Sequence, residues 1–121
     1  MKYDLVRPCK DCPFRTDIQA FLTPGRAREI CDSMIREQRT FSCHKLNEPG
    51  DDGEMHETAN SQHCAGALIF LERLNRPNQM MRIAERFGMY DRTKLDMDAP
   101  VFRTPAQMIA AQPKRRGRRA A

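Results

Sequence analysis

Four of the five cysteines in this chain form the pattern that most restricts how it can fold. Cys9 and Cys12 make a CxxC pair, Cys43 lies 31 positions after Cys12, and Cys64 lies another 21 positions on. Two residues between thiolates allow one tight turn to aim both sulfurs at a single ion. Each of the other two cysteines falls at a junction between predicted elements. The spacing therefore predicts one metal centre that ties three separate segments together.

Two other interpretations of the cysteines remain open. Cys43 and Cys64 could be ordinary buried cysteines, which are common in protein cores. The CxxC pair could be a redox dithiol, but thioredoxin-type motifs lie between a strand and a helix, and no such pattern surrounds Cys9. Residues 1–20 also lack the apolar run of a signal peptide, so we expect a cytoplasmic protein without stable disulfides. A metal centre with four cysteine ligands is favoured.

The pattern leaves the metal and one detail of the ligand set open. Both one zinc ion and one [4Fe-4S] cluster accept four cysteines. Zinc is the commoner metal in small structural sites, whereas Pro13 directly after Cys12 resembles cluster ligands of ferredoxins. His44 and His63 each neighbour a predicted ligand, and either could replace it in a site of three cysteines and one histidine. Cys31 falls on the apolar face of a predicted helix, so we expect it in the core.

The excess positive charge of the chain is confined to its C-terminus. The net charge is +5, and the last eight residues carry five cations and no acid. The rest of the chain is formally neutral, with 16 basic and 16 acidic residues. These five cations are Lys114, Arg115, Arg116, Arg118 and Arg119. Such a tail predicts contact with DNA or RNA through phosphates, and its alternative is a solubilising disordered terminus.

The apolar pattern predicts a mainly helical fold with a minor short sheet, of about four helices. Thr-Pro pairs at Thr23 and Thr104 predict N-caps followed by proline at the first helical position, and Gly88 predicts the end of the third helix. The expected helices span residues 24–38, about 61–74, 77–87 and 105–112, and an extended segment covers residues 40–44. The second apolar stripe is Cys64, Ala67, Leu68, Leu71 and Leu74, and the third is Met80, Met81, Ile83, Ala84 and Phe87.

These elements predict one globular domain over residues 1–112 and a flexible basic tail over residues 113–121. A hydrophobic content of 40% with no tryptophan gives a thin core, for which a metal staple is suitable. No apolar run approaches the length that spans a bilayer, so no membrane contact is expected.

Sequence neighbours of the predicted centre could form an anion pocket. Arg15 suits bidentate phosphate contact, and His44 and Lys45 follow the third cysteine directly. An ordinary surface pair of Arg15 with Asp17 is the simpler interpretation. The chain has no phosphate-binding glycine loop and no serine nucleophile motif. A closed set of four cysteines leaves no open position for water, so an enzyme is the less favoured prediction.

Three motifs together resemble an uncharacterised family of small cysteine-containing proteins of phages and bacteria. They are the CxxCPFR run from Cys9, the FSCHK segment from Phe41 and the CAGA segment from Cys64. The resemblance covers about residues 7–100 and implies that the four cysteines act as one set. It implies no activity, and it raises the prospect of a phage accessory protein.

The leading functional prediction is a non-enzymatic, metal-binding module that contacts nucleic acid. The first alternative is a protein-interaction factor that inhibits or modulates a host enzyme, because Met80, Met81, Phe87 and Met89 would suit adaptable contacts. The second alternative is an iron–sulfur redox protein or metalloenzyme.

Overall fold

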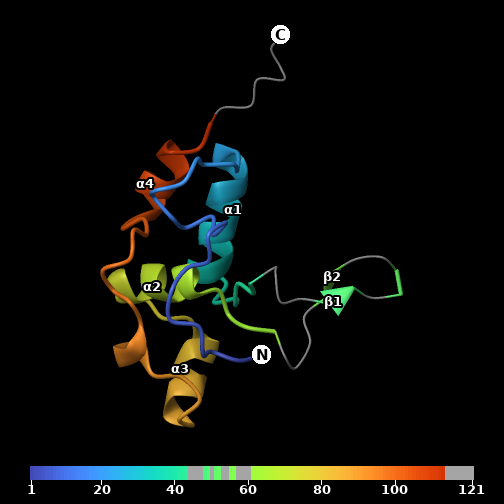
Figure 1. Cartoon of the computed structure of the whole chain (residues 1–121), viewed down its shortest axis with the longest axis vertical. Coiled ribbons are helices and arrows are strands. Elements are labelled where there is room, and N and C mark those ends of the chain that lie inside the picture. Colours follow the sequence, from blue (N-terminus) through green and yellow to red (C-terminus); the bar gives the residue numbers. More distant parts are fainter. Residues whose placement is uncertain (44–47, 50, 53–54, 57–60, 114–121) are drawn as a thin grey trace.

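The computed structural model describes residues 1–43, 48–49, 51–52, 55–56 and 61–113, and over these residues the chain is mainly helical (Figure 1). Residues 114–121 of the predicted tail over residues 113–121 lie outside the described residues, as do His44 and Lys45. The elements are α1 (Pro24–Ile35), β1 (Glu48–Pro49), β2 (Met55–His56), α2 (Ala65–Arg73), α3 (Gln79–Arg86), the 3-10 helix η2 (Arg92–Lys94) and α4 (Pro105–Ala110). The expected class, a small and mainly helical domain, is confirmed.

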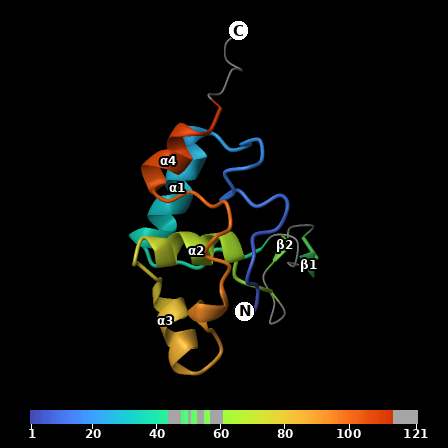
Figure 2. The same cartoon turned by 60° about the vertical axis from the view of Figure 1, so that its left-hand side comes forward.

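Helix α2 forms the centre of the fold. Every residue from Ala65 to Leu71 is buried, so the helix is covered on all sides. Figures 1 and 2 show it lying between α1 and α4 on one side and α3 on the other. The predicted apolar stripe of α2 was therefore too narrow, because a helix buried all round needs apolar residues on every face.

Helices α1 and α4 pack together above α2 in both views (Figure 2). The predicted caps are confirmed, since the Thr23 hydroxyl accepts from the Arg26 amide and the Thr104 hydroxyl accepts from the Gln107 amide. Cys31 lies in this interface, 2% exposed, with its sulfur 3.8 Å from that of Met108. Its predicted place in the core is confirmed.

Three extended segments meet beside the start of α2. Lys2 pairs with Gln62, and Ser42 pairs with His63. The Cys43 amide donates to the Gln62 carbonyl at 2.8 Å, and the Cys64 amide donates to the Phe41 carbonyl at 2.7 Å. Because residues 61–63 form these pairs, α2 begins at Ala65 with Cys64 as its N-cap, and the prediction that it begins near Ser61 was wrong. Strands β1 and β2 form a two-residue antiparallel ladder.

Helix α3 departs most from the sequence prediction. Asn78 caps it, and Gly88 follows its end with a φ of +76°, as expected for a helix terminus. Its buried residues are only Met81 and Ala84. The predicted core positions Met80, Ile83 and Phe87 are exposed, because no other described element covers that face of the helix.

A buried histidine connects α3 to the extended segments. His63 is 0% exposed, and its Nε2 lies 3.2 Å from Asn78 Nδ2 and 3.4 Å from the Phe41 amide. Its Nδ1 lies 3.2 Å from the Cys64 carbonyl. Two donors at Nε2 and an acceptor at Nδ1 fix the neutral tautomer with its proton on Nδ1. Burial lowers the pKa of His63 to about 4.

Arg73 at the end of α2 holds the segment that leads to α4. Its guanidinium donates to the carbonyls of Val101 at 2.6 Å and Ala99 at 3.0 Å, and also to that of Met97. The same segment pairs with the chain after Cys12, where the Phe102 amide donates to the Phe14 carbonyl at 3.0 Å.

No helix among the described residues is both long and apolar enough to cross a bilayer.

Candidate metal centre

The CxxC segment forms a tight turn fixed by aromatic packing. The Cys12 amide donates to the Cys9 carbonyl at 3.2 Å, and the Arg15 amide donates to the Cys12 carbonyl at 3.1 Å. Phe14 is fully buried and packs its ring against Phe41 and Phe70, with both centroid distances at 5.4 Å. The turn is therefore held against both the extended segment and α2.

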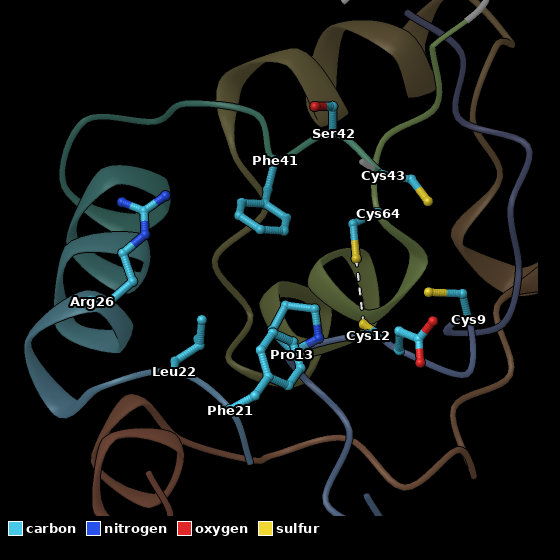
Figure 3. A pocket seen from close by; sticks show the side chains of 11 residues that line it. Cys9, Cys12, Pro13, Phe21, Leu22, Arg26, Phe41, Ser42, Cys43 and Cys64 are labelled. Carbon is cyan, nitrogen blue, oxygen red and sulfur yellow. Dashed lines mark hydrogen bonds between the residues drawn. The ribbon is translucent and has the colours of Figure 1, made fainter. Parts of the chain in front are cut away.

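All four predicted ligand cysteines line a single pocket of about 380 Å³ (Figure 3). Cys12, Cys43 and Cys64 are buried, and Cys9 is half-buried. The rest of the lining is Asp11, Pro13, Phe21, Leu22, Arg26, Phe41 and Ser42. Figure 3 shows thiols from the turn, the extended segment and the start of α2 brought to the same region. None of the five cysteines of the chain is in a disulfide.

The sulfurs of Cys12 and Cys64 lie 3.5 Å apart, within hydrogen-bonding distance for sulfur. A hydrogen bond from the Cys64 thiol lowers the pKa of Cys12, and the amides of Phe14 and Gly66 lower it further, while burial opposes the shift. The same shared proton and complete burial raise the pKa of Cys64. Because Gly66 lies in the first turn of α2, the amino end of that helix supports a thiolate at Cys12.

Gly66 allows the turn and the helix to approach this closely. A Cβ atom at this position would overlap the Cys12 sulfur and would lie 3.1 Å from Phe14 Cβ. The reason is steric, since no positive φ is recorded for Gly66. Gly66 belongs to the CAGA motif, but the sequence alone did not predict a role for it. The sequence signal for close packing at this position is a small residue two positions after a predicted ligand cysteine.

The donor set suits a thiolate-bound centre, but the described residues do not present a complete single-ion site. Two thiolates of a tetrahedral zinc site, each at ~2.3 Å from the metal, are about 3.8 Å apart. The Cys12–Cys64 pair has nearly this spacing. Over the described part of the chain, no three His, Cys, Asp or Glu side chains lie close enough together to hold an ion. Cys9 and Cys43 border the same pocket without completing such a group.

The structure tests only one of the two histidines that were predicted as substitute ligands. His63 does not line the cysteine pocket, and both of its ring nitrogens contact protein groups, which gives it a structural role. His44 lies outside the described residues, so its role stays a prediction.

Arg15 braces the turn from outside the pocket. Its guanidinium pairs with the Asp17 carboxylate, with nitrogen–oxygen distances of 2.7 Å and 2.6 Å, and donates to the Cys9 carbonyl at 3.2 Å. The hydrogen bond from Arg15 lowers the pKa of Asp17. The expected anion pocket of Arg15, His44 and Lys45 stays a prediction, because its last two members fall outside the described residues.

One side of the pocket is apolar, and the sequence did not predict it. Phe21, Leu22 and Phe41 line it, and Arg26 stands at the first turn of α1. Phe21 is 57% exposed. Phe21 and Leu22 lie in residues 15–22, for which no regular element was predicted, and the fold brings them beside the thiols. The pocket therefore combines thiols with an apolar wall.

The fold and this site define a small, mainly helical protein with a cysteine-lined pocket. The model of a family of unknown function, DUF6283, matches residues 5–119, and the chain belongs to this family. This fits the expected resemblance to an uncharacterised family, and it extends past residue 100 into the basic tail. No curated protein and no solved structure matches the chain.

Proposed function

We propose that this chain is a small metal-binding module whose single thiolate-bound centre is held by Cys9, Cys12, Cys43 and Cys64. The observation that supports this proposal is the convergence of all four side chains on one pocket from three separate segments. The bound centre is one zinc ion or one [4Fe-4S] cluster, both of which take four thiolates.

The fold favours the ligand form of one of these thiols, Cys12. A metal ligand must be a thiolate, and the amides of Phe14 and Gly66 favour that form of Cys12. Cys9 and Cys43 would complete the set by turning toward the Cys12–Cys64 pair. The centre would then connect the turn, the extended segment and α2, which stabilises a domain with a thin core.

Metal analysis with matched cysteine variants tests this proposal. Full-length protein purified anaerobically is compared with Cys9→Ala, Cys12→Ala, Cys43→Ala and Cys64→Ala, and with Cys31→Ala as the control. We expect a fixed metal content in the wild type and the control, and a loss in all four pocket variants. A colourless protein with zinc indicates the ion, whereas iron, sulfide and absorbance at about 400 nm indicate the cluster.

The proposal fails if the wild type holds no metal above background. It also fails if the pocket variants keep the wild-type content while they remain folded. Circular dichroism of each variant distinguishes loss of metal from loss of the fold.

We further propose that the basic C-terminal residues add affinity for DNA or RNA. The support is the sequence alone, since five cations follow Pro113 and the remaining chain is neutral. Deleting residues 114–121 should then weaken binding and reduce the slope of log affinity against log salt by up to about four units. Absence of nucleic-acid binding by the full chain at low salt would contradict this part.

Two alternatives keep specific support. A protein-interaction factor that inhibits or modulates a host enzyme is favoured by the exposed apolar face of α3. An iron–sulfur redox protein or metalloenzyme requires the cluster outcome above, followed by reversible bleaching with a reductant. A phage accessory role rests on the motif resemblance and stays a prediction.

A further inference from the structure

Helix α3 presents an apolar stripe to solvent. Met80, Ile83 and Phe87 follow an i, i+3, i+7 spacing, which places them on one face of a helix. Their exposed fractions are 44%, 39% and 73%. Met89, just beyond the helix, is 56% exposed and extends the apolar surface. We name these four residues the α3 stripe.

The helix that carries the α3 stripe is fixed in place. The adjoining part of its apolar face buries Met81 at 0% and Ala84 at 4% exposure. Asn78 caps the helix and contacts His63, so α3 is anchored to the extended segments. The stripe is therefore a preformed surface, and docking a partner would cost little conformational entropy on the side of this protein.

Positive charge borders the α3 stripe. Arg82 and Arg86 line a surface depression of about 330 Å³ together with Gln79 and Ile83. The one acidic residue of the helix, Glu85, has its carboxylate 3.4 Å from the Arg92 guanidinium. The potential beside the stripe is thus positive, and a complementary partner would bring carboxylates to Arg82 and Arg86.

We propose that the α3 stripe docks an acidic amphipathic helix of a partner protein. The apolar face of that helix would pack on Met80, Ile83 and Phe87, and its carboxylates would pair with Arg82 and Arg86. Apolar anchors at i, i+3 and i+7 are the recognition pattern of one helix against another. Phe87, the most exposed of the three, would be the main anchor, since large aromatic side chains dominate such interfaces.

Other occupants fit these observations less well. A second copy of this chain would place Arg82 and Arg86 near the same arginines across a two-fold axis, and like charges oppose that contact. A membrane surface would require deeper apolar insertion, whereas Met80 and Ile83 are already more than half covered. Nucleic acid would use the arginines but would leave the apolar residues in water.

A matched pair of peptides tests the proposal on the full-length protein as purified. Both peptides are helical, have about 15 residues and carry the same leucine stripe, but one has Glu and the other Lys at the flanking positions. Fluorescence anisotropy should show the acidic peptide binding at least about tenfold more tightly than the basic one. Phe87→Ser and Ile83→Ser should each weaken acidic-peptide binding by about tenfold or more.

One further variant tests the contribution of charge to binding, and another is a control for the serine substitutions. The double variant Arg82→Gln, Arg86→Gln should remove the preference between the peptides. Met97→Ser is the control, because Met97 has the same 39% exposure as Ile83 but lies on the loop before α4. Its binding should equal the wild type, and urea unfolding should show that every variant is folded.

Several results would overturn the proposal. Equal affinity for the two peptides, no binding of either, or wild-type binding by Phe87→Ser would each refute it. Concentration-dependent dimerisation that Phe87→Ser abolishes would assign the α3 stripe to a second copy, and Phe87-dependent sedimentation with phosphatidylserine vesicles would assign it to a membrane. None of these measurements depends on which cysteines bind the metal, so failure here leaves the proposed centre standing.

Discussion

Gly66 at the start of α2 lies directly against the sulfur of Cys12, in a space that no side chain can share. The contact joins the CxxC turn to the amino end of the central helix. It also brings the Gly66 amide to the Cys12 sulfur, where it favours the thiolate. One glycine therefore sets both the packing and the electrostatics of the candidate centre.

Replacement of Gly66 by alanine should damage the pocket. The added methyl group must displace either Cys12 or the buried Phe14, and such overpacking costs about 1–3 kcal/mol of unfolding free energy. Urea unfolding measures this loss, and the metal content should fall with it. Gly25→Ala in α1 is the control, because a Cβ there meets nothing within 4 Å, and it should be neutral or slightly stabilising. Equal stability of the two variants would contradict the steric argument.

Replacement of Arg73 by methionine should loosen the segment before α4. Three carbonyls would lose a charged donor, with an expected cost of about 2–4 kcal/mol. Arg73→Lys should recover only part of this loss, since an ammonium lacks the planar fork of the guanidinium. Thermal unfolding compares both with Arg76→Met, an exposed arginine near the same helix end. A wild-type melting temperature for Arg73→Met would refute the bracing role.

The buried His63 should make the fold sensitive to mild acid. The unfolded chain binds a proton at His63 near pH 6.5, whereas the folded protein resists it until about pH 4. Below pH 6.5 the unfolded state therefore gains protons first, and the free energy of unfolding falls by up to about 3 kcal/mol as the pH approaches 4. Above pH 6.5 this contribution is fully present.

The ring resonances of His63 give a direct measurement of this titration. Their NMR shifts should stay constant from neutral pH down to about pH 5 and move only near pH 4. A midpoint at the ordinary value of 6.5 in the folded protein would show that the ring is not held neutral by burial.

Cys31 should react much more slowly than Cys9 in the chelator-treated protein. Burial, with a smaller contribution from Asp32, raises its pKa to about 11, so at about pH 8 almost no thiolate forms. Iodoacetamide followed by mass spectrometry should label the half-buried Cys9 well before Cys31. Equal labelling rates of Cys9 and Cys31 in the folded protein would contradict this order. Labelling in urea is the control, and there the two thiols should react at the same rate.

Local signals predicted the starts of α1 and α4, whereas non-local pairing determines the start of α2. Thr23 and Thr104 cap helices because hydroxyl, amide and proline are neighbours in sequence. The start of α2 was misplaced because residues 61–63 pair with segments about 20 and 60 positions away, which no local propensity encodes.

The apolar pattern of α3 was identified, but its surroundings were not. Helical spacing predicted that Met80, Ile83 and Phe87 share a face, and the helix has that face. Spacing alone does not say whether another element will cover it. The cysteine pattern likewise predicted which thiols gather, while the apolar wall around Phe21 depends on tertiary structure. The metal itself stays a prediction.

The hydrogen bonds from Arg73 to the carbonyls of Met97, Ala99 and Val101 limit how the cysteine region can be transferred to another protein. The first 75 residues contain every cysteine of the chain, so they are the natural choice for a minimal fragment. Yet the strand-like stretch that supports the turn after Cys12 comes from residues 100–102, which α2 itself secures. A fragment that ends at residue 75 would lack that support. The arrangement of the cysteines therefore depends on the C-terminal third of the chain.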